Sequence, residues 1–331
     1  MRCSLNESLE RRFRAPRVAV AHFCVHIFAS VCFFACTSLF AFCTLIHSPT
    51  TALATFPENS EPAARILYTA DTLGHIHPCQ TCGDTPTGGL ARRAALLKTY
   101  AATRSQPLIL AGPNEFYSDG ESPSPQTADS LAPALHAAFG SMPYAAVYLG
   151  PATVADWQQR SLPLHPNSLP VADQPVSRIF PAGRLTAACI FLPPGANADG
   201  SPSPDQILMA QLAAREARSK ADLVIAVSPW GMQAENALTS SLGGYFHILL
   251  GGGNGIAIPG QASGELGFPG PLWIRSDRRG RAVNELAIHA LPAPGTPWIE
   301  GVHFSSRLLF LDHSLPQDKT ISKITAQSTG P

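Results

Sequence analysis

Charged residues are scarce in this sequence and show no excess of either sign. Asp, Glu, Lys and Arg make up 14% of the 331 residues, and 23 acidic side chains balance 23 basic ones. A chain without a basic excess has no overall electrostatic attraction for nucleic acid, so we expect no nucleic-acid partner. Apolar residues make up 45% of the chain. This content is sufficient for a hydrophobic core and excludes disorder throughout the chain.

The chain also lacks the sequence signatures of several enzyme classes. It has no Ser/His/Asp signature, no nucleophile elbow and no internal repeat. Gly251-Gly252-Gly253 resembles a phosphate-binding loop only in its glycines, because no Lys followed by Ser or Thr comes after it. The function must therefore be sought in other patterns.

The N-terminal segment, residues 1–54, has the features of a targeting element. Four arginines between Arg11 and Arg17 precede an apolar run from Val18 to Ile46. This run exceeds the roughly 20 residues that span a bilayer, and the basic flank predicts that the body lies outside. Ala52-Leu53-Ala54 offers a cleavage site. We therefore expect an exported protein of the periplasm or cell envelope, with a cleaved signal peptide or a membrane anchor at residues 18–46.

Cysteine is rare outside this segment. Five of the eight cysteines lie within it, which leaves Cys79, Cys82 and Cys189 in the body. In an oxidising compartment Cys79 and Cys82 can form a disulfide. Cys189 lies in the apolar run Leu185–Leu192 and is predicted to be a buried strand thiol.

After a polar spacer at residues 55–64, the body alternates strand-like and helical patterns. The predicted strands are short apolar runs bounded by turn residues: Arg65–Ala70, Pro107–Ala111, Ala145–Leu149, Leu185–Leu192, Asp222–Val227 and His247–Leu250. The predicted helices are Gly89–Thr103, Ala128–Phe139 and Asp205–Lys220. The last pattern is the clearest, with Asp205 as its expected N-cap and apolar residues at Ile207, Leu208, Leu212 and Ala213.

Three further apolar runs close the body. Pro271–Arg275, Ala282–His289 and Val302–Asp312 are interpreted as antiparallel strands, with Arg278–Arg281 as a hairpin turn. Strand–helix alternation followed by antiparallel strands predicts an α/β sandwich. We expect one domain at residues 65–315 and a polar C-terminal tail at residues 316–331.

The body resembles the calcineurin-like metallophosphatases, and in particular their 5'-nucleotidase/UDP-sugar hydrolase (UshA-like) branch. The best stretch is Ile66–Leu97, with Tyr68-Thr69-Ala70-Asp71 after the first strand and Gly88-Gly89-Leu90 before the first helix. Within that branch it is similar to UshA-like (seleno)proteins that carry a Pro-Cys-x-x-Cys segment, here Pro78–Cys82. The resemblance implies an αββα sandwich with ligand-bearing loops after the strands.

The family's chemistry uses two metals that bridge a phosphate and activate a water. The resemblance implies that Asp71 is the one retained ligand of the first loop, whereas Leu73 stands where the family has His. In the second loop Pro113 replaces an Asp, and Asn114 or Glu115 could substitute only if the loop shifted.

The remaining loops depart from the family pattern in the same way. Gly150-Pro151-Ala152 replaces the Asn and His of the third loop, and Pro229 replaces the His of the fourth. Only Asn254 in Gly251–Gly255 could serve as a ligand in the fifth. We therefore expect no two-metal phosphoesterase activity and no cofactor. The alternative, an active phosphoesterase, would hold Mn, Fe or Zn.

The segment from His75 to Cys82 could carry other chemistry. A C-x-x-C pair can be redox-active when a helix N-terminus or a cation lowers a thiol pKa, or it can be a structural disulfide. Arg92 and Arg93, in the first turns of the predicted helix, are the nearby cations. The alternative is a zinc site formed by His75, His77, Cys79 and Cys82.

These observations lead to one interpretation with three alternatives. We interpret the chain as an exported protein with a degenerate phosphatase-like domain that binds a ligand or carries a thiol pair in the envelope. Trp230 and Asn114 are the expected lining of the former metal cavity. The alternatives are an active metal-dependent phosphoesterase, a thiol oxidoreductase that uses Cys79 and Cys82, and a purely structural envelope protein.

Overall fold

The computed structural model describes residues 61–328, apart from 80–84, 118–124, 243 and 266–267. The predicted N-terminal segment and Cys82 lie outside the described residues. All described residues belong to one compact unit of the chain, Ala54–Pro331. Within the described part, no helix is long and apolar enough to cross a membrane.

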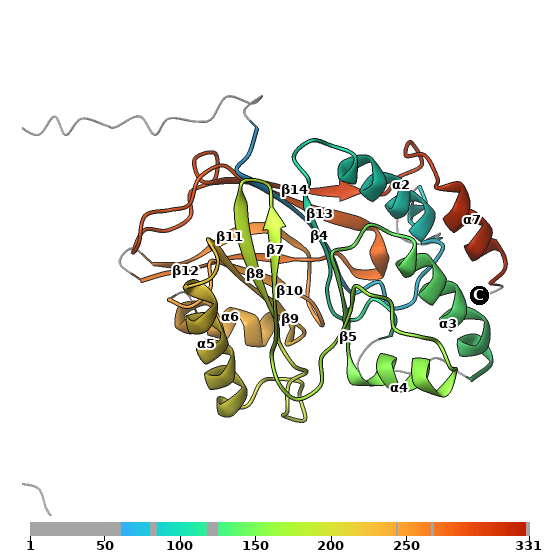
Figure 1. Ribbon diagram of the computed structural model, residues 1–331, viewed down its shortest axis with the longest axis horizontal. Coiled ribbons are helices and arrows are strands. Elements are labelled where there is room, and N and C mark those ends of the chain that lie inside the picture. Colours follow the sequence, from blue (N-terminus) through green and yellow to red (C-terminus); the bar gives the residue numbers. More distant parts are fainter. Residues whose placement is uncertain (1–60, 80–84, 118–124, 243, 266–267, 329–331) are drawn as a thin grey trace, which may run out of the picture. The chain divides into compact units, whose positions relative to one another are not determined.

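Two six-stranded mixed sheets form the centre of this unit (Figure 1). The first has the order β14-β13-β1-β4-β5-β6, and its strands are β1 (Ala64–Thr69), β4 (Leu108–Ala111), β5 (Ala146–Leu149), β6 (Ser168–Pro170), β13 (Ala282–Ile288) and β14 (Phe304–Phe310). The second has the order β11-β12-β10-β9-β8-β7, and its strands are β7 (Val176–Ala182), β8 (Leu185–Phe191), β9 (Leu223–Ser228), β10 (Ile248–Gly251), β11 (Ile258–Glu265) and β12 (Phe268–Arg275).

Helices cover the outer face of each sheet. Those on the first sheet are α2 (Leu90–Ala101), α3 (Pro125–Gly140), α4 (Pro151–Gln159) and α7 (Lys319–Ala326). Those on the second are α5 (Pro204–Arg218) and α6 (Gly231–Leu242). Side chains alternate along the strands, so Ile66 and Tyr68 enter the core between the sheets while Leu67 packs under the helices. The predicted αββα sandwich is confirmed.

The six apolar runs predicted as strands form β1, β4, β5, β8, β9 and β10, with ends shifted by at most one residue. Cys189 is a free, fully buried cysteine in β8, and burial raises the pKa of its thiol. The predicted N-cap of α5 is wrong. Ser203 caps this helix in a capping box with Gln206, and Pro204 occupies the first turn, so Asp205 lies inside the helix.

The predicted set of closing antiparallel strands is wrong in part. β12 belongs to the second sheet, where Ile248 of β10 pairs with Leu272 in parallel. β13 and β14 pair antiparallel in the first sheet. The segment Arg278–Gly280 is therefore a short 3₁₀ helix that crosses from one sheet to the other rather than a hairpin turn.

The C-terminal segment expected as a polar tail contains α7. Asp318 caps this helix by accepting a hydrogen bond from the Ile321 amide at 3.0 Å. Ile321 is fully buried under the first sheet. The spacing of Ile321 and Ile324 is the apolar pattern that indicates a short helix, and their burial holds the segment on the domain.

A buried ion pair connects α2 to the loop after β4. Arg93 and Glu115 are almost completely buried, with 3.1 Å between Nη1 and Oε2. The Thr69 and Thr72 hydroxyls donate to the same carboxylate, and Arg93 also donates to Thr72 at 2.6 Å. Removing one partner of such a pair leaves an uncompensated buried charge.

We expect Arg93→Met to lower the free energy of unfolding by about 3–5 kcal/mol, because Glu115 would remain buried without its cation. Lys98→Met on the same helix is the matched control, since its ion pair with Asp318 is partly exposed and contributes at most about 1 kcal/mol. Urea-induced unfolding measures both. Equal losses in the two variants would contradict a structural role for the buried pair.

Candidate functional site

Four loops meet where parallel strands of the two sheets end. They follow β1, β4, β9 and β10, and backbone hydrogen bonds join them. The Asp71 amide donates to Pro113 at 3.0 Å, and the Gly252 amide donates to Ser228 at 2.8 Å. Asp71, Leu73 and Asn114 have φ angles of 55°, 54° and 58°. Non-glycine residues rarely adopt this backbone region, and strained residues of this kind concentrate at functional sites.

Asp71 is the centre of this group of loops. Its Oδ1 accepts hydrogen bonds from Asn114 Nδ2 at 2.9 Å and from the Gly253 amide at 2.8 Å. Its Oδ2 is buried and has no hydrogen-bond partner among the described residues. Burial raises the pKa of Asp71 to about 7, although the two hydrogen bonds and the charge of Arg275 lower it. The side chain therefore changes its charge near neutral pH.

Arg275, at the end of β12, lies beneath the loop after β10. Its Nη2 donates to the carbonyl oxygens of Gly252, Gly253 and Asn254 at 3.0–3.1 Å. Its Nη1 forms a fully buried ion pair with Glu235 of α6. A single guanidinium thus fixes the backbone of the loop that carries Asn254 and ties it to the helix behind it.

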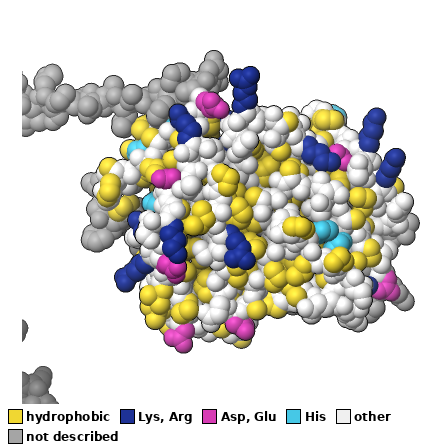
Figure 2. Space-filling view, viewed as in Figure 1, with side chains coloured by type: hydrophobic (Ala, Val, Ile, Leu, Met, Phe, Trp, Pro, Cys, Tyr) yellow, Lys and Arg dark blue, Asp and Glu magenta, His cyan; other side chains and the backbone are white. Residues whose placement is uncertain are grey.

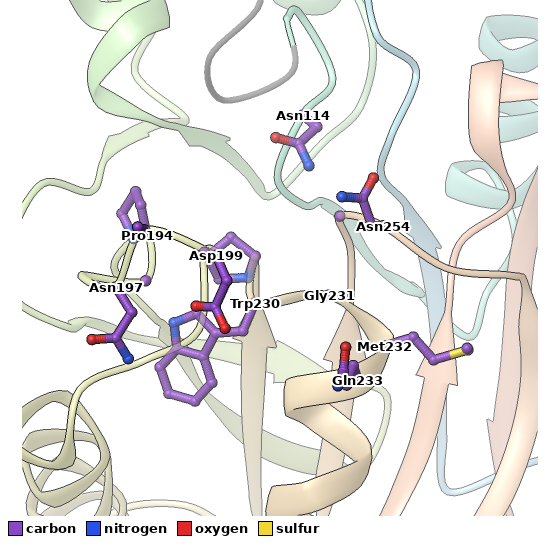
Figure 3. A pocket seen from close by; sticks show the side chains of 14 residues that line it. Asn114, Pro194, Asn197, Asp199, Trp230, Gly231, Met232, Gln233 and Asn254 are labelled. Atoms are coloured by element: carbon purple, nitrogen blue, oxygen red, sulfur yellow. The ribbon is translucent and has the colours of Figure 1, made fainter.

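A cavity of about 440 Å³ opens beside these loops. Asn114 and Asn254 lie on one side of it, with Asn197 and Asp199 on the other (Figure 3). Trp230 lines the cavity but is only 5% exposed, because its indole packs into the core of the second sheet and donates to the Pro193 carbonyl at 2.9 Å. Little of the indole is therefore accessible from the cavity.

The structure brings together Asp71, Asn114, Trp230 and Asn254 but leaves the other candidates outside this site. His75 and His77 are exposed. Cys79, in the short strand β2 (Pro78–Cys79), is disulfide-bonded. Within the described ranges, no group of three His, Cys, Asp or Glu side chains is arranged to hold a metal ion.

The two arginines of α2 have different partners. Arg92 donates to the carbonyl oxygens of Pro86, Gly88 and Leu311, and Arg93 pairs with Glu115. The charge of Arg93 is balanced by that carboxylate, whereas Arg92 contacts neutral carbonyl oxygens and keeps its charge, so its effect on a thiol pKa stays a prediction.

Sequence reasoning missed Arg275 and Glu235, which hold the site together. The signal for Arg275 is a cation directly after the apolar run Leu272–Ile274, at a strand end. Glu235 gives no such signal, because it is one polar residue in a mixed helix. Its burial follows from the packing of α6 on β12, where Trp273 Nε1 donates to its carboxylate at 3.0 Å.

Comparison with solved structures gives the fold. The 5'-nucleotidase precursor of Thermus thermophilus aligns with a TM-score of 0.60 at 18% identity, over 80% of this chain and 58% of that one. The SoxB sulfate thiohydrolase of the same organism aligns with a TM-score of 0.60 at 15% identity, over 82% and 61%. The calcineurin-like phosphoesterase YfkN of Bacillus subtilis aligns with a TM-score of 0.57 at 14% identity, over 81% and 97%.

The chain has the calcineurin-like phosphoesterase fold. The alignments span about three fifths of the length of the 5'-nucleotidase precursor and of SoxB. No protein-family model matches the sequence, and no curated protein matches it either. At these identities the likeness concerns the fold alone, so the chemistry of the phosphoesterase-like domain must be argued from its own residues.

The raised pKa of Asp71 predicts how stability depends on pH. Between about pH 4 and pH 7 the folded chain keeps a proton on Asp71 that the unfolded chain has lost, so a rise in pH favours unfolding. Over this window we expect Asp71 to reduce the free energy of unfolding by on the order of 2–4 kcal/mol. Asp71→Asn keeps the hydrogen-bond acceptor, removes the titration and should remove this loss. Identical pH profiles for the two proteins would contradict the prediction.

Proposed function

We propose that this is an exported protein whose phosphoesterase-like domain has no two-metal phosphoesterase activity and acts as a binding or thiol-bearing protein of the cell envelope. The hydrogen bonding of Asp71 carries this proposal. In the comparable family loop an aspartate oxygen faces a metal, whereas here Oδ1 accepts two N–H groups, one of them the Gly253 amide. These N–H groups occupy the directions from which a cation would approach Oδ1, and Oδ2 is the one oxygen of Asp71 without a hydrogen-bond partner among the described residues.

The donor set around Asp71 does not fit a two-metal centre. Such a centre requires carboxylate, imidazole or amide ligands from several strand ends. Leu73, Pro113 and Pro229 have no coordinating atom in their side chains. Pro113 also fills the space against Gly252, where a β-carbon would lie 2.6 Å from its Cγ. The loops are thus in direct contact with each other.

Arg275 holds these loops together through hydrogen bonds. Its positive charge and three hydrogen bonds to carbonyl oxygens hold the loop at Gly252–Asn254, a structural task that bridging metals perform in a metal centre. The ion pair with Glu235 holds the guanidinium in place beneath the loop. These contacts support a site that is organised by hydrogen bonds and one ion pair.

The cavity beside these loops supports a binding function. Asn114, Gln233 and Asn254 offer it neutral amide groups, and Asp199 is the one charged residue among the described residues that line it. Ligand sites combine a preformed hollow of this size with a few convergent polar groups. Export and membrane attachment through residues 18–46 are part of the proposal and rest on the basic flank and apolar run of the sequence.

Elemental analysis of the chain, purified without chelator after growth with manganese, iron and zinc, tests this proposal. We expect less than roughly 0.1 metal ion per chain, because Asp71 alone cannot hold one. Phosphodiester and nucleotide hydrolysis should not exceed the heat-denatured control. Asp71→Ala should change neither result.

Two outcomes would contradict the proposal. Near-stoichiometric metal that is lost in Asp71→Ala would establish a phosphoesterase centre. Metal that survives in Asp71→Ala but is lost in Cys79→Ser/Cys82→Ser would establish the zinc site instead.

The disulfide at Cys79 favours thiol–disulfide exchange as a second candidate function. Cys79 pairs with Thr87 in a two-stranded sheet just before α2. This hypothesis predicts that the bond is reduced at a potential above about −300 mV, the range of structural disulfides lying below that value. Thiol labelling in glutathione buffers of graded potential measures it, with Cys79→Ser/Cys82→Ser as the blank. A midpoint below about −300 mV would assign the bond a structural role.

A further inference from the structure

Helix α5 has its small side chains on the sheet and its large apolar side chains in solvent. Its buried residues are Ala210, Ala214 and Ala217. Leu208, Met209 and Leu212 are 53%, 40% and 48% exposed. This is the reverse of the usual amphipathic helix, which buries its largest apolar residues because their transfer from water contributes most. The sequence had grouped Leu208 and Leu212 with the other apolar residues of this helix.

The alanines explain how α5 packs but not what its outer side does. They let the helix lie close to β8 and β9, where they contact the apolar layer formed by residues such as Ile190 and Val224. Leu208 and Leu212 add nothing to that layer. Exposed apolar side chains that cluster on one surface mark a site of contact with a partner or a membrane.

A groove extends this apolar surface to the edge strand β7. Its volume is about 470 Å³, and Ile179 of β7, which is 50% exposed, lines it together with Ala213 and Glu216 of α5. Helical spacing puts Met209 on the same side of α5 as Ala213. We call Ile179, Leu208, Met209 and Leu212 the α5–β7 face. Figure 2 looks onto this side of the molecule, where hydrophobic side chains are exposed among basic and acidic ones.

Basic side chains surround the α5–β7 face. They are Arg178, Arg215, Arg218 and Lys220. Lys220 pairs with Glu216 at 2.6 Å, whereas none of the three arginines forms a salt bridge with a described residue. Arg215 and Arg218 are held by Tyr245 through hydrogen bonds to its hydroxyl and carbonyl. Asp205 and Glu216 are also exposed on α5, so these four cations and two anions give the surround a net positive charge although the whole chain is neutral.

The first described residues of the chain lie beside the turn between β7 and β8, next to this face. The Arg184 amide, in the turn between β7 and β8, donates to the Ala63 carbonyl at 2.7 Å. Residues 47–63 separate this point from the apolar run and extend to about 60 Å at most. A membrane anchor at residues 18–46 would therefore keep the β7 edge within reach of the bilayer.

We propose that the α5–β7 face docks on the surface of the lipid bilayer, with Leu208, Met209, Leu212 and Ile179 among the acyl chains and the arginines at anionic headgroups. The proposal rests on the membrane attachment proposed above. Large apolar side chains ringed by Lys and Arg are the pattern of interfacial helices, and each basic residue near an anionic surface adds to the attraction.

A second copy of the chain fits the face less well. Pairing two α5–β7 faces would bring the same arginines of both copies together. The face is also small. A helix about 22 Å long beside one strand gives a width of about 15 Å and an area of about 330 Å², against about 800 Å² per partner in a stable interface.

Tryptophan quenching in proteoliposomes tests the docking. The full chain is reconstituted in vesicles of phosphatidylcholine and phosphatidylglycerol, with or without bromine on the acyl carbons near the headgroups. Leu212→Trp is compared with Leu164→Trp, since both positions are 48% exposed and Leu164 lies after α4 on the other sheet's side. The four native tryptophans are at most 5% exposed and give a constant background.

We expect bromolipid to quench the Leu212→Trp signal at least about twofold more than the Leu164→Trp signal. Arg178→Glu in the Leu212→Trp background should reduce this difference, because it replaces a cation of the surround with an anion. Equal quenching at the two positions would overturn the proposal. So would an unquenched but blue-shifted Leu212→Trp emission that strengthens with protein density, which would assign the face to a second copy.

Vesicle flotation separates this test from the proposed attachment. A chain that fails to float with vesicles would overturn both proposals. A chain that floats while Leu212→Trp stays unquenched would overturn the docking and leave the attachment by residues 18–46 standing.

Discussion

The buried guanidinium of Arg275 is the constraint on which the loops of this domain depend. It neutralises Glu235 on one side and donates to three loop carbonyl oxygens on the other. Because its fork of N–H groups is rigid, the carbonyl oxygens must converge on it, and the loop then directs the Gly253 amide at Asp71. Arg275, at the end of a strand, thus holds the loop at Gly252–Asn254, and this loop in turn positions the carboxylate of Asp71.

These contacts hold the loops at the strand ends of a phosphoesterase-like fold. The arrangement of the two sheets is that of the solved phosphoesterases, and the loops at the strand ends hold Asp71 and Asn114 in strained backbone conformations. Strain of this kind persists only where surrounding contacts impose it. Here those contacts are Pro113 against Gly252 and the hydrogen bonds of Asp71. The fold therefore keeps the loops together beside a cavity that Asn114 and Asn254 line.

The sequence predicted what is local and missed what depends on tertiary packing. Apolar runs such as Leu223–Val227 are strands because every side chain in them is buried on one face or the other. The separation of β12 from β13 was not predictable, since both are apolar segments and only their partners differ. In α5 the pattern predicted the helix but not its orientation, because alanines rather than leucines fit closely against the sheet. Asp71 was recognised from its family loop, whereas Arg275 acts through carbonyl groups that no side-chain pattern reveals.

Thermal unfolding with and without a chelator tests most directly whether Arg275, and not a metal, holds the loops. The account predicts that EDTA leaves the Tm of the native chain unchanged. Arg275→Met should lower the Tm strongly in both conditions, because it leaves Glu235 buried without its cation. For a domain of this size, about 1 kcal/mol shifts Tm by roughly 2–4 °C. A fall of that size or more when EDTA is added to the native chain would contradict the account.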